Sequence, residues 1–183
     1  MAINADDCFV RLSVDATALS VWVRSLIQSD DLWDFTMSTY PAFSVGPLPL
    51  DTCFEKCPEL NQINNIATIH SISVLKMLPH SIAETHIDSH RGVAINMLVL
   101  DENNNSVTNE SSSVSVFVNK ETRETLKNNF QPNTLYLFNT HMPHCVINHD
   151  GHRHMLSVTF DLKPNLLPFR ALKKFLKATH YIL

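Results

Sequence analysis

Residues 134–160 read TLYLFNTHMPHCVINHDGHRHMLSVTF, and their pattern decides the fold class. Short apolar runs alternate with polar turn residues, and the turn at Asp150-Gly151 has the composition typical of a tight reversal between strands. The stretch therefore predicts three short strands in close succession, at 134–138, 144–148 and 154–162.

The last of these strands has two different faces. Alternate side chains of a strand point to opposite sides of a sheet. One side carries a mixed set of residues, namely Arg153, Met155, Ser157 and Thr159. The other side is almost wholly apolar, with His154, Leu156, Val158 and Phe160. We expect the Arg153 side to face into a ligand-holding barrel and the apolar side to be covered by helices from the chain termini.

The remainder of the chain supplies further short strands. Alternating or apolar runs predict strands at 7–14, 66–78, 93–100 and 113–118. Many short strands with few helices are typical of a double-stranded β-helix, the jelly-roll architecture also found in cupins. The predicted fold class is mainly β, within a single domain over 1–183 whose core covers about 66–162.

Helices are predicted at both ends of this jelly roll. Asp15 or Thr17 can cap an N-terminal helix that ends near residues 29–30, and an amphipathic closing helix is expected over 165–176. Two stretches are predicted to lack regular structure. Four prolines lie in residues 34–65, which could form one wall of a substrate entrance, and the polar tract 101–113 resembles an exposed loop.

Composition excludes several classes of protein. With 44% hydrophobic and 17% charged residues, the 183-residue chain is not disordered throughout. Its net charge of −4 does not indicate the positively charged surface that nucleic-acid-binding proteins typically have. The sequence shows no secretory signal at its start and no apolar run of the roughly 20 residues that a membrane span needs. We therefore expect a cytoplasmic protein with no nucleic-acid or membrane partner, and the oligomeric state stays open.

The triplet His86-Ile87-Asp88 is the strongest chemical signal. Residues i and i+2 of an extended strand point to the same side, so His86 and Asp88 can chelate one metal. His144, at the start of a distant predicted strand, can complete a three-point face. Two histidines and one carboxylate with open positions opposite suit non-haem Fe(II) chemistry.

The ordered set of His86, Asp88, His144 and Arg153 resembles the 2-oxoglutarate/Fe(II)-dependent dioxygenases. The lead-in VLKMLPH at 74–80 and the Asn-Thr-x-x-Pro-His stretch are closest in look to the aspartyl/asparaginyl β-hydroxylase-like branch. The resemblance covers roughly residues 70–162. It implies that His86, Asp88 and His144 bind Fe(II), that Arg153 pairs with the distal carboxylate of the co-substrate 2-oxoglutarate, and that the enzyme hydroxylates an amino-acid, peptide or other small-molecule substrate.

The sequence also departs from the pattern of these families. Many such enzymes carry Arg-x-Ser, but Met155 stands two residues after Arg153, so a second carboxylate contact must come from elsewhere or be absent. The hydroxylase branch commonly lacks the carboxylate ligand. The presence of Asp88 favours a full triad and argues against a halogenase, which needs that position for chloride.

Three further residues are candidates for the pocket. If a three-residue turn at 90–92 pairs Ser89 with Val93, Asn96 faces the same side as His86 and can contact the co-substrate. Arg91 is either a grip for a substrate carboxylate or a solvated turn residue. His141 can reach the metal ligands or the substrate from its turn.

Alternative metal chemistry remains open at this point. The four cysteines fit free thiols. Cys53-x-x-x-Cys57 could hold zinc but has no second cysteine pair, and Cys145 is predicted to be core. The same ligand triad could also hold zinc or nickel in a non-enzymatic cupin-like binding module, or serve a cupin of another reaction class. Arg153 discriminates between them, because a structural metal site has no need of a buried arginine.

Overall fold

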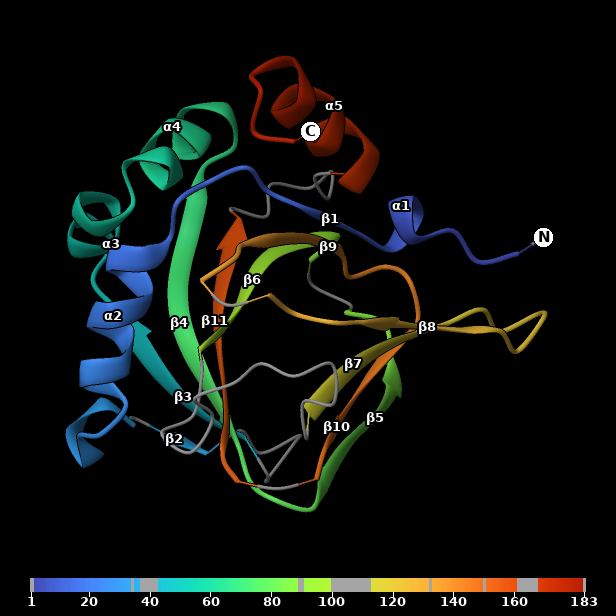
Figure 1. The fold of residues 1–183 in the computed structure, drawn as a ribbon, viewed down its shortest axis with the longest axis horizontal. Helices are drawn as coiled ribbons and strands as arrows, with labels where there is room; N and C mark the ends of the chain where they lie inside the picture. The colour runs from blue at the N-terminus through green and yellow to red at the C-terminus, as the bar shows by residue number, and fades with distance from the viewer. Residues whose placement is uncertain are drawn as a thin grey trace.

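The computed structural model describes residues 2–33, 35–36, 43–88, 91–99, 113–131, 133–149, 151–160 and 168–182. Its strands form two antiparallel sheets that pack face to face (Figure 1). The mainly β jelly roll predicted from the sequence is confirmed. The described helices include none that is long and apolar enough to cross a membrane.

The larger sheet has seven strands. In spatial order they are β1 (Phe9–Arg11), β9 (Tyr136–Asn139), β6 (Val93–Val99), β11 (Arg153–Phe160), β4 (Ile69–Met77), β3 (Phe43–Leu48) and β2 (Phe35–Thr36). The smaller sheet has four strands in the order β5 (Ser81–His86), β10 (His144–Asn148), β7 (Ser113–Val118) and β8 (Thr125–Asn128). β11 lies between β6 and β4, so both of its edges are paired.

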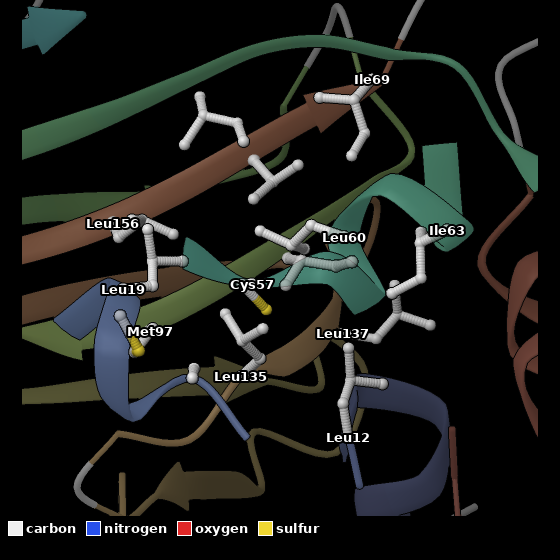
Figure 2. Packing of buried hydrophobic residues seen from close by; sticks show 14 of the residues in the cluster. Leu12, Leu19, Cys57, Leu60, Ile63, Ile69, Met97, Leu135, Leu137 and Leu156 are labelled. Atoms are coloured by element: carbon white, nitrogen blue, oxygen red, sulfur yellow. The ribbon is translucent and has the colours of Figure 1, made fainter. Parts of the chain in front are cut away.

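Helices cover the outer face of the larger sheet. They are α2 (Thr17–Leu26), α3 (Leu50–Lys56), α4 (Pro58–Ile66) and α5 (Phe169–Ala178), and two shorter segments, α1 (Ala5–Cys8) and a 3₁₀ turn (Asp30–Leu32), flank them (Figure 1). Side chains from these helices pack with Leu156 and Val158 of β11 in the larger hydrophobic core, where Leu19, Leu60 and Leu172 are fully buried (Figure 2). The apolar side of β11 is therefore covered as predicted.

The prediction that residues 34–65 are irregular is wrong for the part of this stretch that the structure describes, residues 35–36 and 43–65. This stretch contains β3, α3 and α4, and it buries Cys53, Leu60 and Ile63 completely. The prolines mark the starts of helices here. Pro49 precedes α3 and Pro58 is the first residue of α4, a position where the missing N–H has no intrahelical partner to lose.

Several element boundaries also differ from the prediction. The opening strand shrinks to β1, the first helix ends at Leu26, and β8 appears where no strand is predicted. Ser89, which is predicted to pair with Val93, lies outside the described residues. The hairpin that would place Asn96 opposite His86 is wrong, because β5 pairs with β10 while β6 pairs with β9 and β11. The chain thus crosses from one sheet to the other after β5. The loop is predicted over 101–113; Ser113 is instead the first residue of β7, and residues 101–112, the turn residue Asp150 and the start of the closing helix lie outside the described residues.

Candidate metal centre

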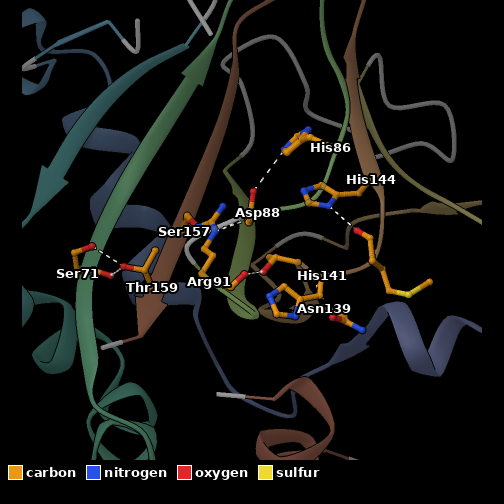
Figure 3. A network of polar contacts seen from close by, with 11 residues as sticks. Ser71, His86, Asp88, Arg91, Asn139, His141, His144, Ser157 and Thr159 are labelled. Atoms are coloured by element: carbon orange, nitrogen blue, oxygen red, sulfur yellow. Dashed lines mark hydrogen bonds and ion pairs between the residues drawn. The ribbon is translucent and has the colours of Figure 1, made fainter. Parts of the chain in front are cut away.

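The three predicted metal ligands come together at one end of the space between the sheets. His86 is the last residue of β5 and His144 is the first of β10, and the two face each other in the strand register. Asp88 follows two residues after β5. One potential ligand atom from each residue lies within 4.8 Å of the other two, and this is the only such group found among the described residues (Figure 3).

Backbone carbonyls orient both imidazoles. His86 Nδ1 lies 2.7 Å from the Glu84 carbonyl oxygen, and His144 Nδ1 lies 2.9 Å from that of Met142. A carbonyl can only accept, so each Nδ1 is the nitrogen that donates, which leaves Nε2 as the ring nitrogen that can face a metal. Burial lowers the pKa of His144 from its ordinary value, which leaves this imidazole neutral at neutral pH. Both rings are thereby prepared to act as metal ligands.

The two oxygens of Asp88 have different environments. Oδ1 lies 3.5 Å from His86 Nε2, whereas Oδ2 accepts a 2.6 Å hydrogen bond from Arg91 Nε. The backbone N–H of Asp88 donates to the Thr140 carbonyl oxygen over 3.0 Å, which fixes the chain beyond β5. The donor set of two imidazole nitrogens and one carboxylate oxygen fits a divalent ion such as Fe(II).

The cysteine alternative finds no support in the structure. Cys53 and Cys57 are fully buried, and burial raises the pKa of each thiol to about 12, so neither is a thiolate at neutral pH. Neither belongs to a group of three potential ligands among the described residues. Cys145 is half-buried beside His144, and burial raises its pKa as well.

A cavity of about 140 Å³ adjoins the three ligands. Residues of both sheets line it. The polar lining residues other than the metal ligands are Arg91, Asn96, Ser115, Thr140 and Arg153, and the apolar ones are Phe43, Leu75, Ala83, Phe138, Val146 and Met155. The mixed side of β11 therefore faces a cavity between the sheets, as the alternation predicts.

Arg153 brings a positive charge into this cavity. Its side chain is buried, and no carboxylate of the described residues forms an ion pair with it. Nη2 donates a 2.9 Å hydrogen bond to Ser115 Oγ and the guanidinium lies 5.8 Å from the centre of the Phe130 ring, but Nε has no hydrogen-bond partner. Burial lowers the pKa of Arg153 to about 10, so it stays charged at pH 7.

Ser115 is a site residue that the sequence does not reveal. It lies on β7, next to β10 in the smaller sheet, and its hydroxyl oxygen accepts the hydrogen bond from Arg153. It could not be found from spacing along β11, because the contact depends on how the two sheets stack.

The other predicted pocket residues have different outcomes. Asn96 lines the cavity opposite Ser157 in the register of β6 and β11, and its buried Oδ1 has no hydrogen-bond partner. It reaches the cavity although the pairing that predicted its position is wrong. His141 lies in an exposed turn after β9 and does not line this cavity, so its role toward the substrate stays a prediction.

Comparison with known proteins adds a likeness in structure. No protein-family model and no curated protein matches the sequence. A prolyl-4-hydroxylase from Pseudomonas putida superposes with a TM-score of 0.61 at 12% identity, covering 86% of this chain and 94% of that one. HygX from Streptomyces hygroscopicus, solved with nickel and 2-oxoglutarate bound, gives 0.58 at 10% identity over 90% and 89%.

A prolyl hydroxylase from Trichoplax adhaerens, in complex with a peptide fragment, gives a TM-score of 0.56 at 15% identity over 84% and 83% of the two chains. The chain therefore has the fold of the 2-oxoglutarate/Fe(II) oxygenases. This oxygenase fold agrees with the resemblance read from the sequence. The finer branch of aspartyl/asparaginyl hydroxylases is not singled out by these neighbours.

Proposed function

We propose that the protein is an Fe(II)- and 2-oxoglutarate-dependent dioxygenase that hydroxylates an amino-acid, peptide or other small-molecule substrate. The observation that carries this proposal is the buried guanidinium of Arg153, which forms no ion pair with a carboxylate of the described residues and lines the cavity that adjoins His86, Asp88 and His144. A buried charge without a counter-ion is costly, and a carboxylate is the group that a guanidinium fork matches best.

The residues divide into two sets of roles. His86, Asp88 and His144 would hold Fe(II), and Arg153 with Ser115 would bind the distal carboxylate of 2-oxoglutarate. Bound iron and 2-oxoglutarate would supply oxidising power by coupling the decarboxylation of the co-substrate to the use of O₂. The apolar side chains of the cavity, among them Leu75, Val146 and Met155, would exclude water from this reaction.

A non-enzymatic module that holds zinc or nickel would explain the triad alone. It would not explain why an arginine is buried beside the triad with one nitrogen unbonded. Membership of the aspartyl/asparaginyl β-hydroxylase-like branch and a cytoplasmic location remain part of the proposal, and they rest on the sequence. A peptide substrate is supported by the peptide complex of the Trichoplax adhaerens neighbour.

The proposal is tested by succinate formation. Purified protein is loaded anaerobically with Fe(II), mixed with 2-oxoglutarate and O₂, and assayed across a panel of amino acids, peptides and small metabolites. We expect succinate to form in the parent and to be lost in Arg153→Leu, whereas Arg170→Ala should match the parent because Arg170 is an exposed residue paired with Asp7. If Fe(II) binds but no succinate forms, either with any substrate of the panel or without a substrate, the result would favour the binding module.

A further inference from the structure

Arg91 connects the metal centre to the larger sheet. It lies between Asp88, which continues from β5 of the smaller sheet, and Ser157 in the middle of β11. Its own carbonyl oxygen accepts a 2.7 Å hydrogen bond from Thr140 Oγ1, and the Thr140 carbonyl accepts the Asp88 N–H. Side chain and backbone of Arg91 are therefore tied to the same short segment that carries the carboxylate (Figure 3).

Two donors of the Arg91 guanidinium are already in use. Nε donates to Asp88 Oδ2 over 2.6 Å, and Nη1 donates to Ser157 Oγ over 3.2 Å. The side chains of Arg91 and Asp88 are 25% and 16% exposed, compared with 84% and 37% for the surface pair Arg170 and Asp7. Arg91 is thus neither a solvated turn residue nor a fork with all its donors open to a substrate carboxylate.

This arrangement assigns different tasks to the two oxygens of Asp88. Arg91 occupies Oδ2, while Oδ1 is the oxygen that faces His86 Nε2. A carboxylate without such a partner can rotate about its terminal bond and offer both oxygens to a cation. Outer partners of metal ligands typically matter by about 10- to 100-fold in metal affinity.

We propose that Arg91 is a positioning residue that holds Asp88 so that it binds the metal through Oδ1 alone. The inference rests on the proposed metal site. By keeping Oδ2 away from the ion, Arg91 leaves coordination positions opposite the three protein ligands for other groups. Ser157 is the anchor that sets the direction of the guanidinium.

Charge and geometry are separated by Arg91→Lys. Removal of a cation beside the site would by itself strengthen the binding of a divalent ion, whereas loss of orientation would weaken it. Lysine keeps the charge but lacks the planar fork that contacts Asp88 and Ser157 together. A change in Arg91→Lys therefore reports geometry, and Arg170→Lys is the matched control in an ion pair away from the metal centre.

The test uses Co(II), whose visible absorption depends on coordination number. The metal-free parent, Arg91→Lys and Arg170→Lys are titrated with Co(II), and affinity, visible spectrum and thermal midpoint are recorded. We expect Arg91→Lys to bind Co(II) about tenfold or more weakly, with a less intense visible band as the carboxylate becomes bidentate, and Arg170→Lys to match the parent. Ser157→Ala should shift both readouts in the same direction by a smaller amount, and it serves if Arg91→Lys does not fold.

Two negative results have different meanings. Co(II) affinity that is the same in the parent and in His86→Ala would overturn the metal site, and both proposals with it. A parent that binds Co(II) through His86, with unchanged affinity and spectrum in Arg91→Lys and Ser157→Ala, would overturn the positioning role of Arg91 alone.

Discussion

The two sides of β11 show how one strand serves both stability and chemistry. On the helix side, Leu156 and Val158 are fully buried among apolar residues of α2, α4 and α5. On the cavity side, Arg153 and Ser157 are almost as deeply buried, yet they are polar. Arg153 lines the cavity that adjoins the metal ligands, and Ser157 accepts a hydrogen bond from Arg91. Burial to the same depth has different consequences on the two sides. Apolar burial stabilises the fold directly, whereas a buried guanidinium needs a ligand to offset its cost.

The comparison predicts that substitutions around the cavity weaken the binding of the metal or of 2-oxoglutarate and leave the fold intact. We expect the largest effect from His144→Ala and His86→Ala, each of which removes one of three donors and should weaken Fe(II) binding beyond the ~100-fold that an outer partner costs. Anaerobic calorimetric titration with Fe(II) measures the affinity. Parent-like affinity in both variants would show that these histidines do not hold the metal.

On the helix side, the opposite outcome is expected. Leu156→Ala should lower the free energy of unfolding by about 2–5 kcal/mol, because the fully buried leucine leaves a cavity in the larger core. Urea unfolding of the metal-free protein gives this value. Fe(II) affinity at a temperature where the variant is folded should match the parent, and a large loss of affinity would mean that the two sides of β11 are not independent.

Ser115→Ala gives a smaller and more selective effect. It removes the only described hydrogen bond of the Arg153 guanidinium, so the arginine should be held less firmly. We expect 2-oxoglutarate affinity of the Fe(II)-loaded protein to fall by about 1 kcal/mol, or roughly fivefold. Fe(II) affinity measured in the same titrations should stay constant, and a shared loss of both would instead indicate a change in the packing of β7.

The smallest effect is expected for the stability of Arg153→Leu. Arg153 forms no ion pair within the described part of the chain, so its replacement by an apolar side chain removes a desolvation cost while losing the hydrogen bond to Ser115. The ligand-free variant should therefore unfold within about 1 kcal/mol of the parent, or be more stable. Destabilisation as large as that of Leu156→Ala would show that Arg153 is part of the structural core.

The sequence predicts the parts of this molecule that depend on local spacing. The spacing of His86 and Asp88 indicates that they can share a metal, although Asp88 lies beyond the end of β5 and not in the strand from which the pairing is predicted. The two sides of β11 follow from alternation. Contacts between the sheets are different, because they depend on stacking that no local pattern encodes. Ser115 was therefore not predictable, and neither was the pairing of Arg91 with Asp88 and Ser157.

Proline spacing misled the prediction for another reason. Prolines at residues 47, 49 and 58 lower helix and strand propensity when counted over a window, but each here stands in or beside an element that tolerates it. Pro47 lies in β3 beyond the short partner strand β2, and Pro58 begins α4. Position within an element, and not the number of prolines, determines whether regular structure forms.

The account depends most on Arg153 as the receptor of a distal carboxylate. The parent and Arg153→Leu are loaded with Fe(II) under anaerobic conditions and titrated in a calorimeter with 2-oxoglutarate and with 2-oxobutyrate, which lacks that carboxylate. The difference between the two compounds isolates the interaction of Arg153 with the distal carboxylate. The parent should prefer 2-oxoglutarate by about 2–5 kcal/mol, and the variant should bind both compounds alike. A parent that binds both equally, or a variant that keeps the preference, would contradict the account.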